Sequence, residues 1–298
     1  MSGSRKSASA LLVDIGNTRI KWALWHAGRL GRAQAEVYGG WSSKDFARHL
    51  FGPTRNVFGQ DGATRARVPG RIVVASVAGE SVLRRLAAAA RRAKRTGAGT
   101  PSIGPASTII PELIATSRRA AGVVTRYREP WRLGVDRFLG VIAAHHLAGS
   151  RGACVINAGT AVTLDLVDGH GVHWGGAILP GPRLMVESLL QRTAGIARRA
   201  RSGRRLRAAS RASGSSDSQS FFARDTAAAI EQGAAHAVAG AVERAIASSR
   251  RHLGDVAPLV ILTGGDAAEL RRFLPVRCTE VPDLVLRGIA LHAGLALR

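Results

Sequence analysis

The sequence feature that most constrains the fold is a strand–turn–strand pattern near the N-terminus. An apolar run at residues 11–13 ends at Asp14, and a tight turn follows at Gly16 and Asn17. Residues 19–25 then alternate apolar with polar or small side chains, which is typical of a half-buried strand. Glycine lets a ligand approach the backbone of the turn, and successive backbone N–H groups can bind an anion. The pattern therefore predicts either a phosphate cradle beside a metal-facing carboxylate or an ordinary β-hairpin.

A second copy of this pattern occupies residues 153–167. There an apolar run leads to Asn157 and then Gly159, in positions that correspond to Asp14 and Gly16. A pattern that recurs half a chain apart indicates two similar lobes, each of which opens with a glycine-bearing hairpin. We expect the two hairpins to face each other across a cleft and to clamp the phosphates of a nucleotide.

Length and composition are those of a globular protein with two domains. The 298 residues are 46% hydrophobic, which is enough for a sizeable core, and no run of about 18 apolar residues could span a membrane. The first residues lack the apolar core of a signal peptide. Cys154 and Cys278 are the only cysteines and lie in apolar contexts, so we expect two buried thiols in a cytoplasmic protein.

The formal net charge of +23 has two interpretations. Only four of the 43 basic residues are lysines, and alanine and glycine are abundant, as in proteins from GC-rich genomes. The alternative is a nucleic-acid-binding surface held by phosphate contacts. The arginines are spread along the chain and no nucleic-acid motif accompanies them, so we expect no specific nucleic-acid partner.

Hydrophobic periodicity and cap residues place the remaining elements. We expect a third strand at 33–38, a helix capped by Ser42 or Ser43, a buried strand at 71–77 and a helix at 82–95. In the second half we expect a strand at 174–181, an arginine-rich surface loop within 198–220, a long helix at 226–251, a strand at 259–262 and a last helix at 284–297.

A further predicted helix begins at Asp136 and runs to Leu147, with apolar residues at helical spacing. The residues Gly134-Val-Asp-Arg137 place a carboxylate and a guanidinium at its N-terminus. A carboxylate there is commonly no more than a helix cap, and it can also act as a catalytic base. Spacing alone leaves both interpretations open.

Several motifs in a fixed order resemble type III pantothenate kinases, which have the actin/hexokinase/Hsp70-like ATPase fold. The matching segments, which together cover about residues 11–294, are Asp14–Lys21, Tyr127 with Pro130, Gly134–Arg137, Gly159–Asp165, Gly175–Gly181, Thr226 with Ala229, Ile230 and Gly233, and Thr263–Asp266. The resemblance implies an α/β fold of two similar ribonuclease H-like lobes, 1–130 and 131–298, with mixed sheets around a central nucleotide cleft.

The resemblance also implies roles for individual residues. Asp136 is similar to the family's general base, and Asp14 lies near the magnesium that the nucleotide carries. The implied ATP and phosphate contacts are Asp14, Ile15, Gly16, Asn17, Thr18, Arg19, Ile20, Lys21, Thr160, Gly264 and Gly265. The implied pantothenate contacts are Tyr127, Gly134, Val135, Asp136, Arg137 and Thr226.

The expected reaction is phosphorylation of pantothenate by ATP with Mg²⁺, in a cytoplasmic homodimer, as the first step of coenzyme A biosynthesis. Asn157 departs from the family pattern, which has an aspartate there that helps to hold an activating K⁺ or NH₄⁺ ion. An amide oxygen lacks that charge, so we expect weaker binding of the monovalent cation. The alternatives are a kinase of another small alcohol and a non-enzymatic basic regulatory or accessory protein.

Overall fold

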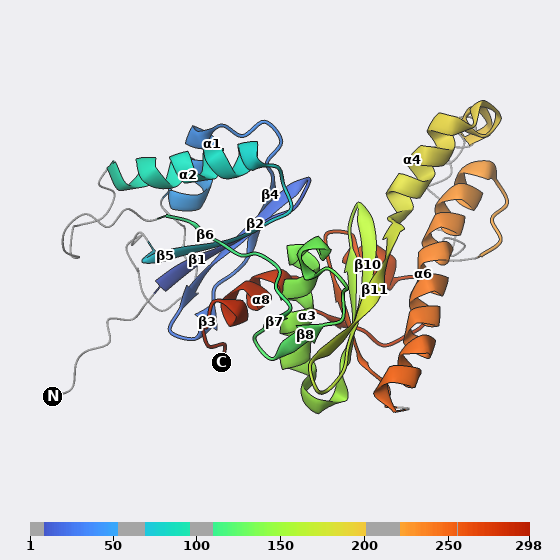
Figure 1. Ribbon diagram of the computed structural model, residues 1–298. Coiled ribbons are helices and arrows are strands. Elements are labelled where there is room, and N and C mark those ends of the chain that lie inside the picture. The colour runs from blue at the N-terminus through green and yellow to red at the C-terminus, as the bar shows by residue number, and fades with distance from the viewer. Residues whose placement is uncertain (1–8, 53–68, 96–109, 201–220, 255) are drawn as a thin grey trace. The chain divides into compact units, whose positions relative to one another are not determined.

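The computed structural model of the chain describes residues 9–52, 69–95, 110–200, 221–254 and 256–298 (Figure 1). The chain divides into two compact units. The first comprises Met1–Ala143 together with Asp283–Arg298, and the second comprises Ala144–Pro282. The predicted arginine-rich loop falls largely outside the described residues. No helix in the described ranges is both long enough and apolar enough to cross a bilayer.

The first unit is built on a mixed sheet with the strand order β3-β2-β1-β5-β6, to which β4 adds by pairing with β2. Strands β1 and β2 are antiparallel, as the N-terminal pattern predicts, whereas β1 and β5 are parallel. The bounds are Ser9–Ile15 for β1, Arg19–His26 for β2, Arg29–Leu30 for β3, Gln34–Val37 for β4, Arg71–Ser76 for β5 and Glu112–Leu113 for β6.

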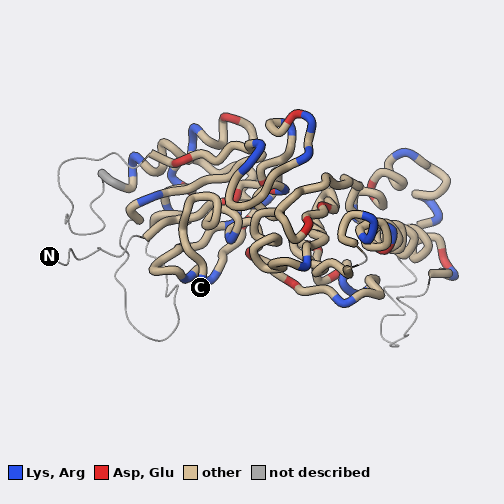
Figure 2. Tube along the Cα trace, turned by 60° about the horizontal axis from the view of Figure 1, so that its bottom comes forward, with Lys and Arg blue, Asp and Glu red and all other residues tan. Residues whose placement is uncertain are grey.

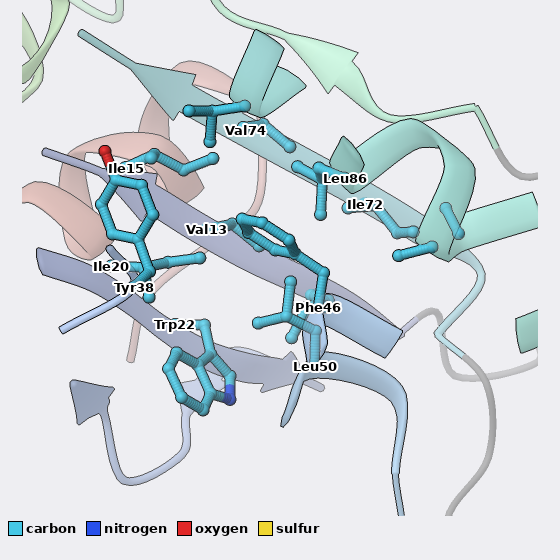
Figure 3. Packing of buried hydrophobic residues seen from close by; sticks show 14 residues of the cluster. Val13, Ile15, Ile20, Trp22, Tyr38, Phe46, Leu50, Ile72, Val74 and Leu86 are labelled. Carbon is cyan, nitrogen blue, oxygen red and sulfur yellow. The ribbon is translucent and has the colours of Figure 1, made fainter. Parts of the chain in front are cut away.

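Helices bury both faces of β1. Leu11, Val13 and Ile15 belong to a core cluster with residues of α1 (Ser43–Phe51) and α2 (Glu80–Arg95), which lie together over one face of the sheet (Figures 1 and 3). Leu12 alternates to the opposite face and is also fully buried, on the side where α8 (Leu284–His292) contacts the sheet. The capping box that begins α1 is formed by Ser42 with Asp45, which confirms the predicted cap.

The second unit repeats this plan. Its strands run in the order β13-β12-β9-β10-β11, with β10 antiparallel to β9 and β12 parallel to it. The bounds are Ala153–Ala158 for β9, Ala161–Val167 for β10, Val172–Pro180 for β11, Leu259–Thr263 for β12 and Thr279–Glu280 for β13. The predicted α/β fold of two similar ribonuclease H-like lobes with mixed sheets is therefore confirmed.

The helices of the second unit cover its sheet through a separate core. Residues Val238 and Val242 of α6 (Thr226–Leu253) pack against Val162 and Leu164 of β10. Asp225 caps α6 by accepting a hydrogen bond from the Ala228 N–H at 2.9 Å, as the sequence predicts. Two shorter helices, α4 (Pro182–Arg192) and α7 (Ala267–Arg271), follow β11 and β12.

Between β6 and β9 the chain forms a short hairpin, whose two strands belong to the seven-stranded sheet, and a helix. The hairpin is formed by β7 (Arg119–Ala120) and β8 (Val123–Thr125), and α3 spans Val135–Ala148. Two turns of 3-10 helix flank α3, at Pro130–Arg132 and Gly149–Arg151. The predicted helix from Asp136 is thus confirmed, with a start one residue earlier.

The last helix is shorter than the sequence predicts, because α8 ends at His292 and not near Leu297. Gly294 adopts a φ of 71°, and the Leu295 N–H donates to the Ala290 carbonyl at 2.9 Å, which closes the helix end. The following residues bind the β2–β3 hairpin: Trp25 Nε1 donates to the Ala296 carbonyl at 2.8 Å. The apolar residues after Gly294 therefore pack as a tail and not as a helix.

Both cysteines are free thiols, as expected. Cys154 is buried in β9, and burial raises its pKa to about 12. Cys278 is only partly buried, which corrects the expectation that both thiols are buried.

The close crossing of α3 and α8 gives a stability prediction. A Cβ atom at Gly288 would collide with the backbone carbonyl of Leu139, whereas one at Gly140 would meet nothing nearer than Leu284 Cδ2 at 3.8 Å. We expect Gly288→Ala to lower the free energy of unfolding by about 1–3 kcal/mol through overpacking. Gly140→Ala, the matched control, should match or exceed the parent because alanine favours helix. Denaturant unfolding measures both, and equal stabilities would contradict the packing described.

Candidate active site

The turn between β1 and β2 forms the first part of the candidate site. The Gly16 N–H donates to the Arg19 carbonyl at 2.9 Å, which closes the turn, and Asn17, Thr18 and Arg19 are exposed. Ile15 and Ile20 pair in register and are fully buried in the core. The predicted phosphate-contact segment therefore contains two kinds of residue. The side chains of Ile15 and Ile20 anchor the turn in the core, so only their backbone groups could contact a ligand, whereas Asn17, Thr18 and Arg19 are exposed.

Asp14 lies just before this turn and has a strongly perturbed carboxyl group. Its pKa is raised from 3.8 to about 7, chiefly because burial disfavours the charged form. The Asp136 carboxylate raises it further by repulsion, and Lys21, which faces Asp14 in the β1–β2 register, lowers it. The structure therefore brings together three residues that the sequence predicts for one site. A cation bound beside Asp14 would offset both the desolvation of its carboxylate and the repulsion from Asp136. These residues therefore fit a Mg²⁺ ion carried by a nucleotide.

Asp136 lies in the first turn of α3, where the helix dipole favours a negative charge. The residue before the helix is Gly134, whose carbonyl accepts the Phe138 N–H at 3.0 Å. A Cβ at Gly134 would lie 2.7 Å from Asp136 Oδ1, so a side chain there would displace the carboxylate. The glycine of the Gly134–Arg137 motif therefore keeps space for the proposed base.

Arg137 and Tyr127 form a second pair in the first unit. Arg137 Nη1 donates to the Tyr127 hydroxyl at 2.8 Å, and its guanidinium carbon lies 5.6 Å from the centroid of the tyrosine ring. Arg137 is only 7% exposed, so its charge is held largely away from water. Arg137 directly follows Asp136 in α3, and a guanidinium paired with a phenol suits a substrate with a carboxylate and polar groups.

Arg118 is a residue at this site that the sequence analysis did not identify. Its guanidinium donates to three backbone carbonyls: those of Thr125 at 3.1 Å, Tyr127 at 2.5 Å and Arg128 at 3.0 Å. These contacts fix the backbone that carries Tyr127. One arginine among many carries no distinguishing sequence signal, so only the fold reveals this role.

In the second unit, the turn between β9 and β10 is also closed by a glycine N–H, but it is one residue shorter than the first, since Ala158 pairs with Val162 whereas Ile15 pairs with Ile20. The Gly159 N–H donates to the Ala161 carbonyl at 3.1 Å, and Thr160 is exposed at its tip. The Gly181 N–H donates to the Thr160 carbonyl at 2.9 Å, so the strand end of the predicted Pro-Gly turn supports the tip. A Cβ at Gly181 would collide with the carbonyls of Gly159 and Thr160, which explains the glycine.

The glycine turn after β12 lies against the same strand. Gly264 has a φ of 105°, and a Cβ there would collide with the backbone of Ala158. The Asp266 N–H donates to the Ala158 carbonyl at 3.0 Å. Thr160, Gly264 and Gly265 are thus carried by two adjoining turns of one unit.

Asn157 is the last but one residue of β9, before the β9–β10 turn, and it pairs in register with Thr163 of β10 and Thr263 of β12. Residues opposite one another on neighbouring strands share a face of the sheet, so three uncharged polar side chains form a row. Thr226, the remaining predicted substrate contact, is the first residue of α6 and is partly buried. Among the described residues, no group of three or more His, Cys, Asp and Glu side chains is arranged to hold a metal ion.

Within each unit, lysine and arginine are spread over the described residues (Figure 2).

Comparison with known proteins gives one consistent result. The sequence model of a family described as type III pantothenate kinase matches residues 10–248. A type III pantothenate kinase of Alkalilimnicola ehrlichii is 36% identical over 282 residues, which cover 94% of this chain and 96% of the relative. One of Azoarcus sp. is 34% identical and covers 95% and 90%.

A solved structure shares the fold. The crystal structure of a protein of Campylobacter jejuni, described as a conserved Baf family transcriptional activator, superposes with a TM-score of 0.50 at 18% identity. The match covers 95% of this chain and 98% of that one.

The raised pKa of Asp14 predicts how stability depends on pH. A carboxyl group whose pKa is higher in the folded state stabilises the fold below its unfolded pKa of 3.8, and that stabilisation is lost as the pH rises through about 7. Asp14→Asn removes this loss, so at pH 8 we expect the nucleotide-free variant to unfold a few degrees above the parent. The difference should shrink at pH 5.

Thermal unfolding at the two pH values measures this effect. Asp45→Asn is the matched control, because hydrogen bonds from Ser42 lower the pKa of Asp45 and its loss should weaken the fold at pH 8. An Asp14→Asn variant that melts below the parent at pH 8 would contradict the raised pKa of Asp14.

Proposed function

This chain belongs to the type III pantothenate kinase family, and we propose that it phosphorylates pantothenate with ATP to give 4′-phosphopantothenate. This is the first step of coenzyme A biosynthesis. The observation that supports the assignment to these residues is that Asp14 pairs with Lys21 on the neighbouring strand and that the charge of Asp136 acts on the Asp14 carboxyl group. Nothing in the comparisons favours a kinase of another alcohol or a non-enzymatic accessory role.

We propose that the ATP phosphates contact the backbone and polar side chains of Asp14–Lys21 in the first unit. Thr160, Gly264 and Gly265 of the second unit supply further nucleotide contacts. Asp14 would hold Mg²⁺ together with phosphate oxygens, and that ion, when bound, neutralises charge that develops on the transferred phosphoryl group. Lys21 adds a positive charge next to the same carboxylate.

Asp136 acts as the general base in this proposal. The primary alcohol of pantothenate is a poor nucleophile, and a carboxylate can accept its proton as the bond to phosphorus forms. The ADP leaving group departs in line, so the protein's main tasks are to orient the alcohol and to stabilise charge. The absence of a side chain at Gly134 lets the Asp136 carboxylate keep its position, because a Cβ there would lie 2.7 Å from Oδ1.

The pantothenate contacts are proposed for Tyr127, Gly134, Val135, Asp136, Arg137 and Thr226. Arg137 would bind the substrate carboxylate with a charge-assisted hydrogen bond, and its contact with the Tyr127 hydroxyl fixes its direction. Val135 is buried at the start of α3, so it contributes by supporting the helix N-terminus and not through exposed side-chain atoms.

The candidate site for a monovalent cation lacks a carboxylate in this chain. The row of Asn157, Thr163 and Thr263 offers oxygen atoms but no charge. We propose that Asn157 binds K⁺ or NH₄⁺ more weakly than an aspartate would, because the amide lacks the Coulomb attraction of a carboxylate.

We propose that each chain has two lobes, 1–130 and 131–298, and that two chains form a cytoplasmic homodimer. We propose no specific nucleic-acid partner. Gly233 and Gly240 on α6 leave open space where a Cβ would lie, which is compatible with close approach of a second copy.

Loss of the base tests the proposed reaction. We expect Asp136→Asn to lower pantothenate-dependent ATP consumption by about 10²–10⁴-fold, the usual contribution of a general base. Asp45→Asn, which removes a carboxylate at the exposed start of α1, should retain the parent rate.

The assay is run in potassium and in sodium buffers. Equal rates in the two would support weak cation binding at Asn157. No turnover with pantothenate in either buffer, or full turnover by Asp136→Asn, would contradict the assigned reaction or the assigned base, respectively.

A further inference from the structure

Tyr38 connects the hydrophobic core to the β1–β2 turn. Strand β4 ends at Val37, which pairs with Arg19, so the next residue of the chain comes level with the turn. The Tyr38 hydroxyl donates to the Gly16 carbonyl at 2.6 Å and also lies 3.3 Å from the Asn17 carbonyl. Two successive carbonyl groups of the turn are therefore held from the same side.

The ring that carries this hydroxyl is itself firmly placed. Tyr38 is 6% exposed and packs at 6.4 Å, centroid to centroid, against Phe46 of α1. Its carbonyl accepts the Trp41 N–H at 2.9 Å, which closes the turn that leads into the helix. Figure 3 shows the hydroxyl at the end of the ring that points toward Ile15, away from Leu50.

The direction of a carbonyl group also fixes the direction of the N–H group in the same peptide unit. In a trans peptide the C=O of one residue and the N–H of the next point in opposite directions, and no cis peptide occurs among the described residues. Holding the carbonyls of Gly16 and Asn17 toward Tyr38 therefore directs the N–H groups of Asn17 and Thr18 to the other side. Two adjacent N–H groups with one direction form an anion-binding concavity.

The preceding carbonyl is fixed as well, because Ile15 accepts the Val77 N–H at 3.0 Å. Hydrogen-bond donors thus hold the carbonyls of Ile15, Gly16 and Asn17. A carbonyl that points toward its donor does not point toward a bound phosphate and so does not repel it. Without a donor, the partly buried Gly16 carbonyl would lose a hydrogen bond, which favours rotation of its peptide.

We propose that Tyr38 is a positioning residue for the nucleotide phosphates, which it serves by fixing the direction of the Asn17 and Thr18 N–H groups. The inference rests on the proposed role of Asp14–Lys21 as the phosphate-binding segment. Burial raises the pKa of the Tyr38 phenol above its ordinary value, so the hydroxyl stays protonated and remains a donor at every working pH.

Tyr38→Phe tests this role because it removes the donor and retains the ring. We expect the KM for ATP and the inhibition constant of ADP to rise about tenfold, which corresponds to one well-placed hydrogen bond. The inhibition constant of adenosine and the KM for pantothenate should stay within about twofold of the parent, because neither ligand has phosphates for the turn to bind.

Two control variants separate this role from a general loss of packing. Phe46→Leu loosens the contact with the Tyr38 ring and keeps the hydroxyl, so it should lower the melting temperature and leave the ratio of ADP to adenosine affinity unchanged. Tyr127→Phe should raise the KM for pantothenate and leave ADP affinity unchanged.

Parental ADP affinity in Tyr38→Phe would overturn the inference, and so would an equal loss of ADP and adenosine affinity. Calorimetric titration with ADP does not require turnover, which keeps the two proposals apart. A parent protein that binds ADP without phosphorylating pantothenate would reject the proposed substrate, and Tyr38→Phe would still decide the role of the tyrosine. A parent that fails to bind ADP would overturn both.

Discussion

The structure depends on a carboxyl group that is partly removed from water at the end of a core strand. Asp14 follows three fully or nearly fully buried residues of β1, and its removal from water raises its pKa to about 7. A charge in such a place is costly unless a cation or donor compensates it. Lys21 compensates in part, and Asp136 opposes it. The ionised form of Asp14 is therefore unfavourable without a partner. A bound cation would stabilise it, and a nucleotide brings such a cation together with its phosphates.

The same strand–turn–strand unit serves the second half of the chain with different side chains. There the acid is replaced by Asn157, and the turn is held by close backbone approaches that only glycine permits, at Gly181 and Gly264. The hydrogen bonds from Gly181 and Asp266 fix the carbonyls of Thr160 and Ala158. In the first unit a side chain, that of Tyr38, performs the corresponding task. Two similar folds thus fix their turns by different means.

Local patterns were sufficient to predict much of the fold. Alternation identified β1 and β2, recurrence identified β9 and β10, and cap chemistry identified the starts of α1 and α6. The end of α8 was missed because the residues after Gly294 are apolar, and only the tail's contacts with the β2–β3 hairpin show why they leave the helix. Tyr38 and Arg118 were missed because their roles depend on strand register and on carbonyl directions, which no sequence pattern records.

A carboxyl-carbon NMR titration of the nucleotide-free protein tests most directly the central claim that desolvation and the charge of Asp136 raise the pKa of Asp14. The parent and Asp136→Asn are labelled at aspartate, and the Asp14 signal is assigned by its loss in Asp14→Asn. The account predicts that Asp14 titrates near pH 7 in the parent and at lower pH in Asp136→Asn, since a repelling charge has been removed. Titration near the ordinary value of 3.8 in both proteins would contradict it.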